Sequence, residues 1–285
     1  MDKISTYRWR RSRSVCAVVI ACLWVGVLPA QNVGPHTQSL GGVSTVLVDP
    51  WAAGNNPALL AGEAPTSLAV DAYNRFFIPE LTEASFLAQT ELYKGNIGLH
   101  YRHYGFSSFQ EHRLRVAYGL MLSQSFWMGT AFTYDRLMQM EGYPSQGSVS
   151  VDVGMLFTLA DDWRIGAQVH NPTRSRWPNA LNELRSMRME IGVEKCFNAS
   201  LAAYAELEKE MDQALLFGCG IAYQVRAPLT IRTGIRTADR SWRLGLSYEK
   251  NGRSINITQV WSQALGLSSS LGLALRFMRA KGKVG

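Results

Sequence analysis

The histidines are the side chains of this 285-residue sequence best suited to acid–base or metal chemistry. Two of them, His100 and His103, lie three residues apart in a segment that alternates like a β-strand, so they point to opposite faces and do not bind one ion. The sequence has no Gly-x-Ser-x-Gly or His-Glu-x-x-His motif and no complete phosphate-binding loop. We therefore predict that the protein is not an enzyme and has no catalytic residues, no metal site and no cofactor. A hydrolase whose site is assembled from distant strands remains a remote alternative.

Charged residues are the second group of chemical interest, because they recur at alternate positions of segments that are apolar on one side. Each shares its face with small or polar residues, whereas the opposite face is apolar. Arg and Glu side chains on neighbouring strands form ion pairs that brace a sheet, and a substrate site is the alternative interpretation. The residues that we expect to line an interior are Arg102, Asp152, Arg164, Glu190, Glu194, Glu206, Arg232, Arg236, Arg243 and Arg276.

The elements that carry these charges are predicted β-strands. From residue 66 onward the sequence alternates between apolar and polar residues, as in "WRLGLSYEK" at 242–250. Most of the alternating segments have about nine to eleven residues, the length that a tilted strand needs to cross a bilayer. The predicted strands are 67–74, 84–92, 96–104, 112–122, 126–136, 148–159, 163–171, 187–196, 199–208, 214–224, 229–237, 242–250, 254–262 and 269–277.

Three features favour a membrane barrel over a soluble sandwich. Short turns such as "NGR" alternate with longer links such as "LMQMEGYPSQG", as in barrels with short periplasmic turns and longer outer loops. Aromatic residues stand at strand ends on the apolar face, and glycines stand mid-strand on the opposite face, where they leave space inside. We predict an all-β fold, a transmembrane antiparallel β-barrel of about 14 strands, because closure pairs every backbone group within lipid. The glycines are Gly98, Gly119, Gly129, Gly154, Gly166, Gly192, Gly234, Gly245 and Gly272.

The first thirty residues have the composition of an export signal. Five basic residues precede the uncharged run "VCAVVIACLWVGVLPA", which is typical of a cleaved signal peptide, with an uncleaved anchor as the alternative. Without these residues the formal net charge falls from +7 to +3, so we expect no nucleic-acid partner. We divide the chain into a signal peptide (1–30), a plug or hatch segment (31–65), an outer-membrane barrel (66–278) and a C-terminal tail (279–285).

The stretch "GGVSTVLVDPWAAGNNPALLAG" at 41–62 fits neither a strand nor an amphipathic helix. We predict two short helical turns, the first capped by Asp49 with a proline following, the second capped by Asn55 or Asn56 before Pro57. A short apolar segment before the first strand of a wide barrel fits inside its lumen, as a plug or hatch. A plain helix start is the alternative reading. The residues assigned to hatch or gating are Gly41, Gly42, Asp49, Asn55, Asn56, Pro57 and Ala58.

The succession of a Gly-Gly segment, an Asp-containing turn, Asn56-Pro57-Ala58 and about fourteen strands resembles the FadL-type outer-membrane barrels. It is most similar to their PorV/PorQ-like branch in the Bacteroidetes group. The resemblance implies an N-terminal hatch, ligand-gated release at the Asn-Pro-Ala segment in fatty-acid transporters, and type IX secretion in PorV and PorQ proteins. The chain departs from the family in its charged interior, its modest outer loops and the eight residues that follow Phe277.

These observations lead to an expected location in the outer membrane of a Gram-negative bacterium. The expected partners are outer-membrane lipids and either a small hydrophobic ligand or secretion-system and cargo proteins. The expected function is transport of a small ligand, or docking of secreted cargo. The alternatives are a non-transporting structural or secretion-partner barrel and, remotely, an outer-membrane hydrolase.

Overall fold

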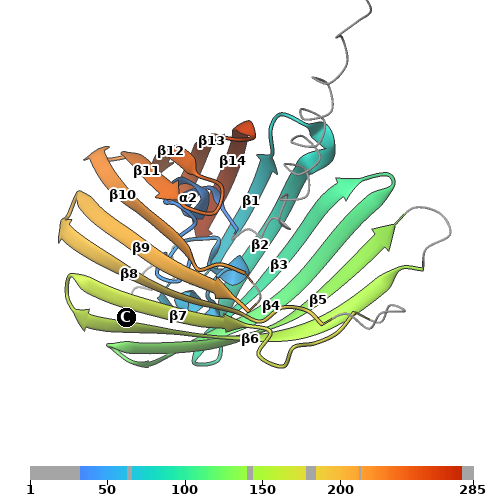
Figure 1. Ribbon diagram of the computed structural model, residues 1–285. Coiled ribbons are helices and arrows are strands. Elements are labelled where there is room, and N and C mark those ends of the chain that lie inside the picture. The colour runs from blue at the N-terminus through green and yellow to red at the C-terminus, as the bar shows by residue number, and fades with distance from the viewer. Residues whose placement is uncertain (1–32, 63–65, 140–143, 178–183, 212, 278–285) are drawn as a thin grey trace, which may run out of the picture. The chain divides into compact units, whose positions relative to one another are not determined.

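The computed structural model describes residues 33–62, 66–139, 144–177, 184–211 and 213–277. Within them, fourteen antiparallel strands form one closed barrel, in which β1 pairs with both β2 and β14 (Figure 1). The strands β2 to β13 each pair with their two neighbours in sequence, and β14 pairs with β13 and β1, so the sheet has no free edge. The predicted fold class is confirmed. The signal peptide predicted at 1–30 and the tail predicted at 279–285 lie outside the described residues.

Each of the fourteen predicted segments corresponds to one strand, with ends that differ by at most three residues. The described residues before and between the strands also form short helices. The strands are β1 (Thr66–Asn74), β2 (Thr82–Leu92), β3 (Gly95–Phe106), β4 (Phe109–Ser123), β5 (Phe126–Gln139), β6 (Gln146–Ala160), β7 (Trp163–His170), β8 (Arg188–Asn198), β9 (Leu201–Glu210), β10 (Leu216–Arg226), β11 (Leu229–Arg236), β12 (Ser241–Lys250), β13 (Arg253–Ser262) and β14 (Gly266–Phe277). The helices are α2 (Pro35–Ser39), η1 (Ala52–Gly54), η2 (Pro57–Gly62) and η3 (Pro79–Leu81).

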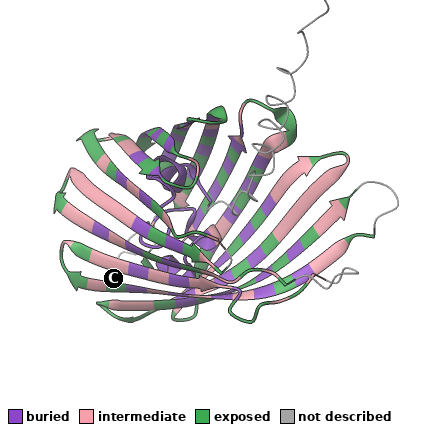
Figure 2. Ribbon diagram, in the orientation of Figure 1, coloured by how far each residue is buried: buried purple, intermediate pink, exposed green. Residues whose placement is uncertain are grey.

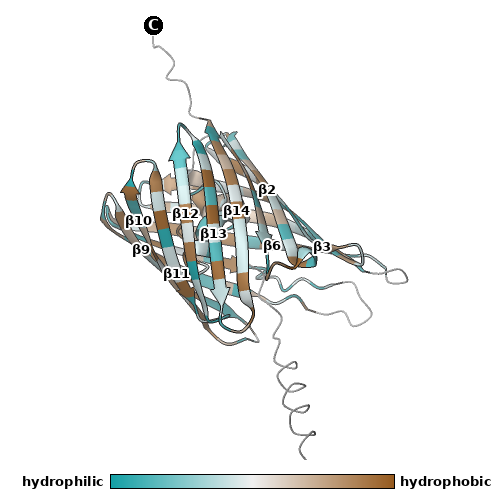
Figure 3. Ribbon diagram, turned by 90° about the horizontal axis from the view of Figure 1, so that it is seen from above, coloured by the Kyte–Doolittle hydropathy of each residue, from teal (hydrophilic) through white to brown (hydrophobic). Residues whose placement is uncertain are grey.

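The two faces of the wall differ in the way that the alternation predicts. Exposed and buried residues follow each other along the strands, which Figure 2 shows as alternating bands. The exposed positions are large and apolar, including Val116, Ile191 and Leu244, and Figure 3 shows bands of hydrophobic residues that recur along β10 to β14. The outer face is therefore the lipid-facing belt of a transmembrane barrel. No helix among the described residues is long and apolar enough to cross a membrane.

The two ends of the barrel differ in the length of their connections. At one end, which we call the tight-turn end, six two-residue turns join the strands, and the start of β1 lies beside the end of β14. At the other, the long-loop end, seven connections range from two residues to the seventeen of 171–187. Outer-membrane barrels have short periplasmic turns and longer extracellular loops. By this rule we expect the long-loop end to face the outside of the cell.

We expect Leu244→Arg to impair assembly, because Leu244 faces lipid near the middle of β12. Arginine near the bilayer midplane costs about 2–4 kcal/mol, whereas near an interface the cost falls to about 0–1 kcal/mol. The yield of folded barrel after refolding into lipid, scored by heat-modifiable migration in gels, measures the effect. Ile255→Arg, which lies close to the tight-turn end, and Leu244→Met are the controls, and both should assemble in higher yield than Leu244→Arg. Equal yields for Leu244→Arg and the wild type would contradict the lipid-facing assignment.

Candidate functional site in the lumen

Residues 33–62 lie against the inner wall of the barrel. The helix α2 contacts β11 to β14, and η2 contacts β3 to β6, so the segment reaches most of the circumference. Figure 1 shows these blue elements inside the ring of strands. Nearly all of its side chains are buried, although the chain before it and the residues 63–65 lie outside the described part. The candidate site is this segment together with the wall that it contacts.

Rows of glycines form the part of the wall nearest to the segment. Gly119, Gly129 and Gly154 are directly paired across β4, β5 and β6. A Cβ atom added at Gly129 would lie 2.5 Å from the backbone nitrogen of Ala58, and one at Gly119 would lie 2.5 Å from a carbonyl oxygen of the segment. Side chains at these positions would therefore displace η2. Two further pairs of glycines contact the segment in the same way: Gly166 and Gly192 contact Thr45, and Gly220 and Gly234 contact Leu40 and Gly41.

Two of the predicted hatch residues need glycine for their own backbone. Gly41 and Gly42 have φ angles of 77° and 91°, a region that side chains disfavour. A Cβ atom at Gly41 would also lie 2.6 Å from the carbonyl oxygen of Cys219. The Gly-Gly pair therefore allows the segment to turn while its backbone touches β10 and β11.

Glu206 holds the segment at its middle. The backbone N–H groups of Ser44 and Thr45 donate to the same carboxylate oxygen of Glu206, at 2.9 and 2.8 Å, and the Thr45 hydroxyl donates to it at 2.7 Å. A hydrogen bond of this kind contributes about 0.5–1.5 kcal/mol net. One inward carboxylate on β9 thus satisfies two backbone donors that have no helix or strand of their own.

A buried ion pair on the opposite side of the lumen also contacts the segment. The Arg115 guanidinium lies 2.5 Å from a carboxylate oxygen of Asp152 and donates to the backbone carbonyl of Asn55 at 2.8 Å. The Asn55 side chain bonds both backbone groups of Val33, at 2.8 Å each, which ties the two ends of the segment together. Further wall-to-segment hydrogen bonds run from Asn96 to the Leu60 carbonyl, from Arg243 to the Gln38 carbonyl and from Thr258 to the Pro35 carbonyl.

The local conformation of the second predicted turn agrees with the sequence, whereas that of the first differs. The Asn56 side-chain oxygen accepts the N–H of Ala58 at 3.1 Å, so Asn56 caps η2 as predicted, with Pro57 next. The first turn, η1, begins at Ala52, and its N-cap is Trp51. Asp49 accepts the Trp51 N–H at 2.9 Å instead of capping a helix that starts at residue 50. Since Asp49 also bonds His36, its carboxylate is shared between α2 and the N-cap of η1.

His36 connects this segment to the wall. Its Nδ1 lies 3.0 Å from the Asp49 carboxylate and its Nε2 lies 2.8 Å from the side-chain oxygen of Asn256 on β13. Burial first, and then the Arg232 guanidinium, lower the pKa of His36 below its ordinary value of 6.5, although Asp49 acts in the opposite direction. The seated imidazole is therefore neutral at neutral pH. Neither His36 nor the helix α2 was singled out from the sequence, because α2 is too short to show a helical period.

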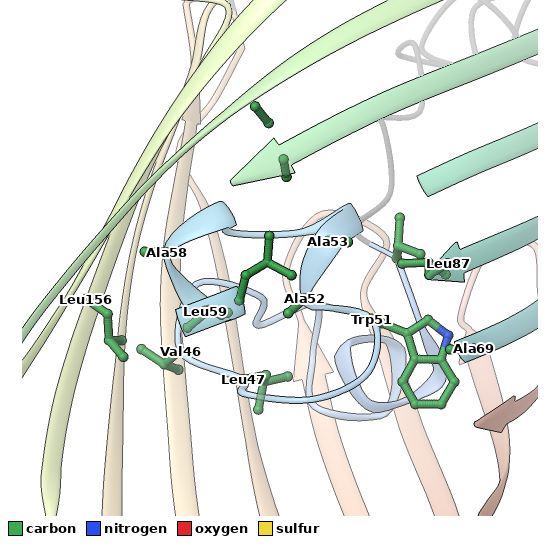
Figure 4. Packing of buried hydrophobic residues seen from close by; sticks show 14 of the residues in the cluster. Val46, Leu47, Trp51, Ala52, Ala53, Ala58, Leu59, Ala69, Leu87 and Leu156 are labelled. Carbon is green, nitrogen blue, oxygen red and sulfur yellow. The ribbon is translucent and has the colours of Figure 1, made fainter. Parts of the chain in front are cut away.

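The middle of the lumen is apolar. Segment side chains such as Val46, Leu59 and Trp51 pack with the wall residues Leu87 and Leu156 (Figure 4). Small wall residues complete the cluster and leave room for the segment: Ala69, Ala117, Ala131 and Ala274. We call this region the apolar waist. The strand alternation did not predict the apolar waist. Alanine and glycine occupy the same face of each strand as the charged residues, so this face was interpreted as polar throughout.

The predicted lumen charges point inward but do not meet in one site. Toward the long-loop end, Asp152 and Glu190 flank His170, whose ring nitrogens lie 3.2 and 3.5 Å from the two carboxylates. With both nitrogens facing carboxylates, His170 is not placed to activate a nucleophile. The other predicted charges contact neighbours on their own part of the wall: Arg102 with Glu83 and Glu111, Arg243 with Asp239, and, nearer the tight-turn end, Arg164 with Glu194 and Arg232 with Ser247.

Ion pairs continue from strand to strand toward the long-loop end. Arg188 contacts Glu190 at 3.1 Å and Glu208 at 3.8 Å, and Glu208 also pairs with Arg236. These contacts link β8, β9 and β11 across the wall. We call these pairs, with those of Arg102, Arg113, Arg115 and Arg243, the charged ring. The described residues contain no group of three or more His, Cys, Asp or Glu side chains arranged to hold a metal ion.

Comparison with known proteins relates the chain to membrane channels through its fold. No model of a protein family matches the sequence, and no curated protein matches it. Among solved structures, the Ralstonia pickettii toluene transporter TbuX is 12% identical and aligns with a TM-score of 0.64, over 88% of this chain and 100% of that one. The monoaromatic hydrocarbon channel CymD is 10% identical, with a TM-score of 0.68 over 89% and 100% of the two chains. A FadL homologue of Pseudomonas aeruginosa is 12% identical, with a TM-score of 0.62 over 87% and 99%.

These likenesses support the FadL-type resemblance at the level of fold. The finer assignment to the PorV/PorQ-like branch stays a prediction. The neighbours themselves carry the names of a toluene transporter and a hydrocarbon channel, and the expectation that this chain is not an enzyme stays a prediction.

We expect Gly129→Leu to unseat the segment, because the new side chain would occupy the position of the η2 backbone. Overpacking costs about 1–3 kcal/mol, so the segment should leave the wall about 5- to 150-fold more often. Limited proteolysis within 33–62 of the folded barrel measures this. Met128→Leu changes the adjacent outward position and should cleave like the wild type. Unchanged cleavage of Gly129→Leu would show that the segment is not seated on this row.

Acid should loosen the segment through His36. A displaced His36 regains an ordinary pKa, so the contribution of the neutral imidazole to docking is complete above pH 6.5 and is lost as the pH falls below that value. We expect protease cleavage within 33–62 to rise between pH 7.5 and pH 5.5 in the wild type. His36→Gln stays neutral throughout and should show a flatter profile, although other carboxylates titrate in both proteins. Identical profiles would exclude His36 as the titrating group.

Proposed function

We propose that the protein carries a small hydrophobic molecule across the outer membrane of a Gram-negative bacterium, with residues 33–62 as a displaceable closure. The observation that carries this proposal is the apolar waist, where apolar side chains of the segment occupy the middle of the lumen. Non-covalent contacts alone hold those side chains against the wall. A ligand with an apolar surface can replace them without leaving the wall exposed to water.

The proposed path crosses three zones of different chemistry. A molecule that enters at the long-loop end first meets the charged ring, whose side chains are paired with one another. It then meets the waist, where Leu87, Trp127 and Leu156 offer apolar surface once the segment moves. The structural neighbours named as toluene and monoaromatic hydrocarbon channels support a small apolar ligand. We accordingly expect Asn56, Pro57 and Ala58 to act in gating, since η2 covers the longest glycine row.

A second candidate function is a non-transporting barrel that docks secreted cargo or a secretion partner. The charged ring favours it, because ion pairs between neighbouring strands stiffen a wall that need not open. The two functions differ in what removal of the segment does. A conduit should open, whereas a braced scaffold should stay closed by its own side chains.

Deletion of residues 33–62 should leave an assembled barrel and raise its conductance in planar bilayers. The reason is that strand pairing carries the fold, while the segment fills the lumen. Heat-modifiable migration of the deletion variant verifies assembly. Met128→Leu, on the outer face of β5, is the matched control and should stay closed. An assembled deletion variant with wild-type conductance would favour the scaffold function.

Uptake by whole cells tests the ligand class. Cells with an intact outer membrane that express the protein should accumulate radiolabelled toluene faster than cells that express a variant in which an added cysteine pair locks the segment to β5. Uptake of a charged aromatic such as benzoate should be equally slow in both strains. Equal toluene uptake by both strains would contradict passage of a hydrophobic molecule.

A further inference from the structure

A groove lies on the outer face of the barrel at the tight-turn end, away from the lumen. It has a volume of about 470 Å³ and is lined by Tyr248, Lys250, Asn251, Arg253 and Ile255, all from the hairpin of β12 and β13. This volume falls within the range of small-ligand sites, about 300–1,000 Å³. The end of β12 is coloured hydrophilic in Figure 3, next to the hydrophobic belt. The groove therefore spans the boundary between hydrocarbon and water.

The turn places two cations side by side in this groove. Asn251 and Gly252 have φ angles of 53° and 73°, as a two-residue hairpin turn with two left-handed residues requires. This turn sets the register in which Lys250 is directly opposite Arg253. Like charges that face each other across a strand pair are destabilising. The hairpin thus carries a local repulsion that a bound anion would relieve.

No acidic side chain among the described residues neutralises this pair. The adjacent acid, Glu249, faces the other side of β12 and pairs with Arg276 at 2.5 Å. Lys195 is a useful contrast, because it also lies on the outer face at the tight-turn end. Its ammonium pairs with Asp162 and stands 4.8 Å from the centre of the Trp163 ring. The charge of Lys195 is therefore balanced by protein groups, whereas no acidic group among the described residues balances the charges of the groove.

We propose that this groove binds an anionic phospholipid of the leaflet at the tight-turn end. The phosphate lies between Lys250 and Arg253, and an acyl chain follows Tyr248 and Ile255 into the belt. The position of these side chains relative to the bilayer fits a bound phospholipid, because basic side chains at a membrane interface extend toward the headgroups and tyrosine rings lie at the level of the headgroups. The site is specific to lipid and not to free phosphate, because Ile255 and the ring of Tyr248 offer apolar surface below the two charges.

Native mass spectrometry of the intact barrel in a neutral detergent tests the proposal. Phosphatidylglycerol and phosphatidylcholine are titrated separately into the wild type, K250Q/R253Q and the control K195Q. A basic residue near an anionic surface contributes about 1 kcal/mol, so the double variant should bind phosphatidylglycerol about 30-fold more weakly. K195Q should match the wild type, and the wild type should bind phosphatidylcholine more weakly than phosphatidylglycerol. The single variants K250Q and R253Q should each lose about fivefold, which provides a test if the double variant does not assemble.

Three results would overturn the proposal. The first is a double variant that binds phosphatidylglycerol with wild-type affinity. The second is equal loss in K195Q, which would assign the effect to net charge alone. The third is complete displacement of the lipid by millimolar inorganic phosphate, which would make the cation pair a site for the free anion.

Discussion

The close approach of one backbone to another is the constraint on which the lumen depends. The backbone of η2 can approach the wall this closely only where the wall has no side chains, and the glycine row of Gly119, Gly129 and Gly154 provides such a surface. Glycine weakens strands because it packs nothing, so a row of paired glycines is costly unless another element covers it. The segment covers this row. The glycines are therefore needed for the segment to fit, and the segment is needed to pack against the glycines.

Alternation with a period of two predicted the barrel, its strand count and the face of each strand, because side-chain direction in a strand depends only on position. The same rule placed Asp152 and Glu190 in the lumen. It could not predict which charges meet, since pairing such as that of Arg115 on β4 with Asp152 on β6 depends on register and on the reach of the side chains across the intervening strand β5. The apolar waist escaped prediction for a related reason. Its wall residues are alanines and glycines, whose importance lies in the volume that they leave for Trp51 and Leu59.

The short helices of the segment mark the limit of local sequence signals. Asn56 followed by Pro57 is a strong helix start, and the structure contains it. Asp49 followed by proline is an equally good signal, but its carboxylate is held by His36 and by the N–H of Trp51. The competing partner comes from thirteen residues earlier in the chain. Tertiary contacts therefore decided the first turn, whereas local contacts sufficed for the second.

Charge and apolar surface are compatible in this lumen because they occupy different levels. The buried charges pair with each other across strands, and breaking one pair by removing a partner leaves an uncompensated charge that costs about 3–5 kcal/mol. Arg115 and Glu206 extend this logic to the segment, since each also binds its backbone. Apolar contacts at the waist can be exchanged for those of a ligand at little cost, whereas these polar contacts have no apolar substitute. The strength with which the segment stays closed is thus set by the polar contacts, and the class of molecule that can take its place is set by the waist.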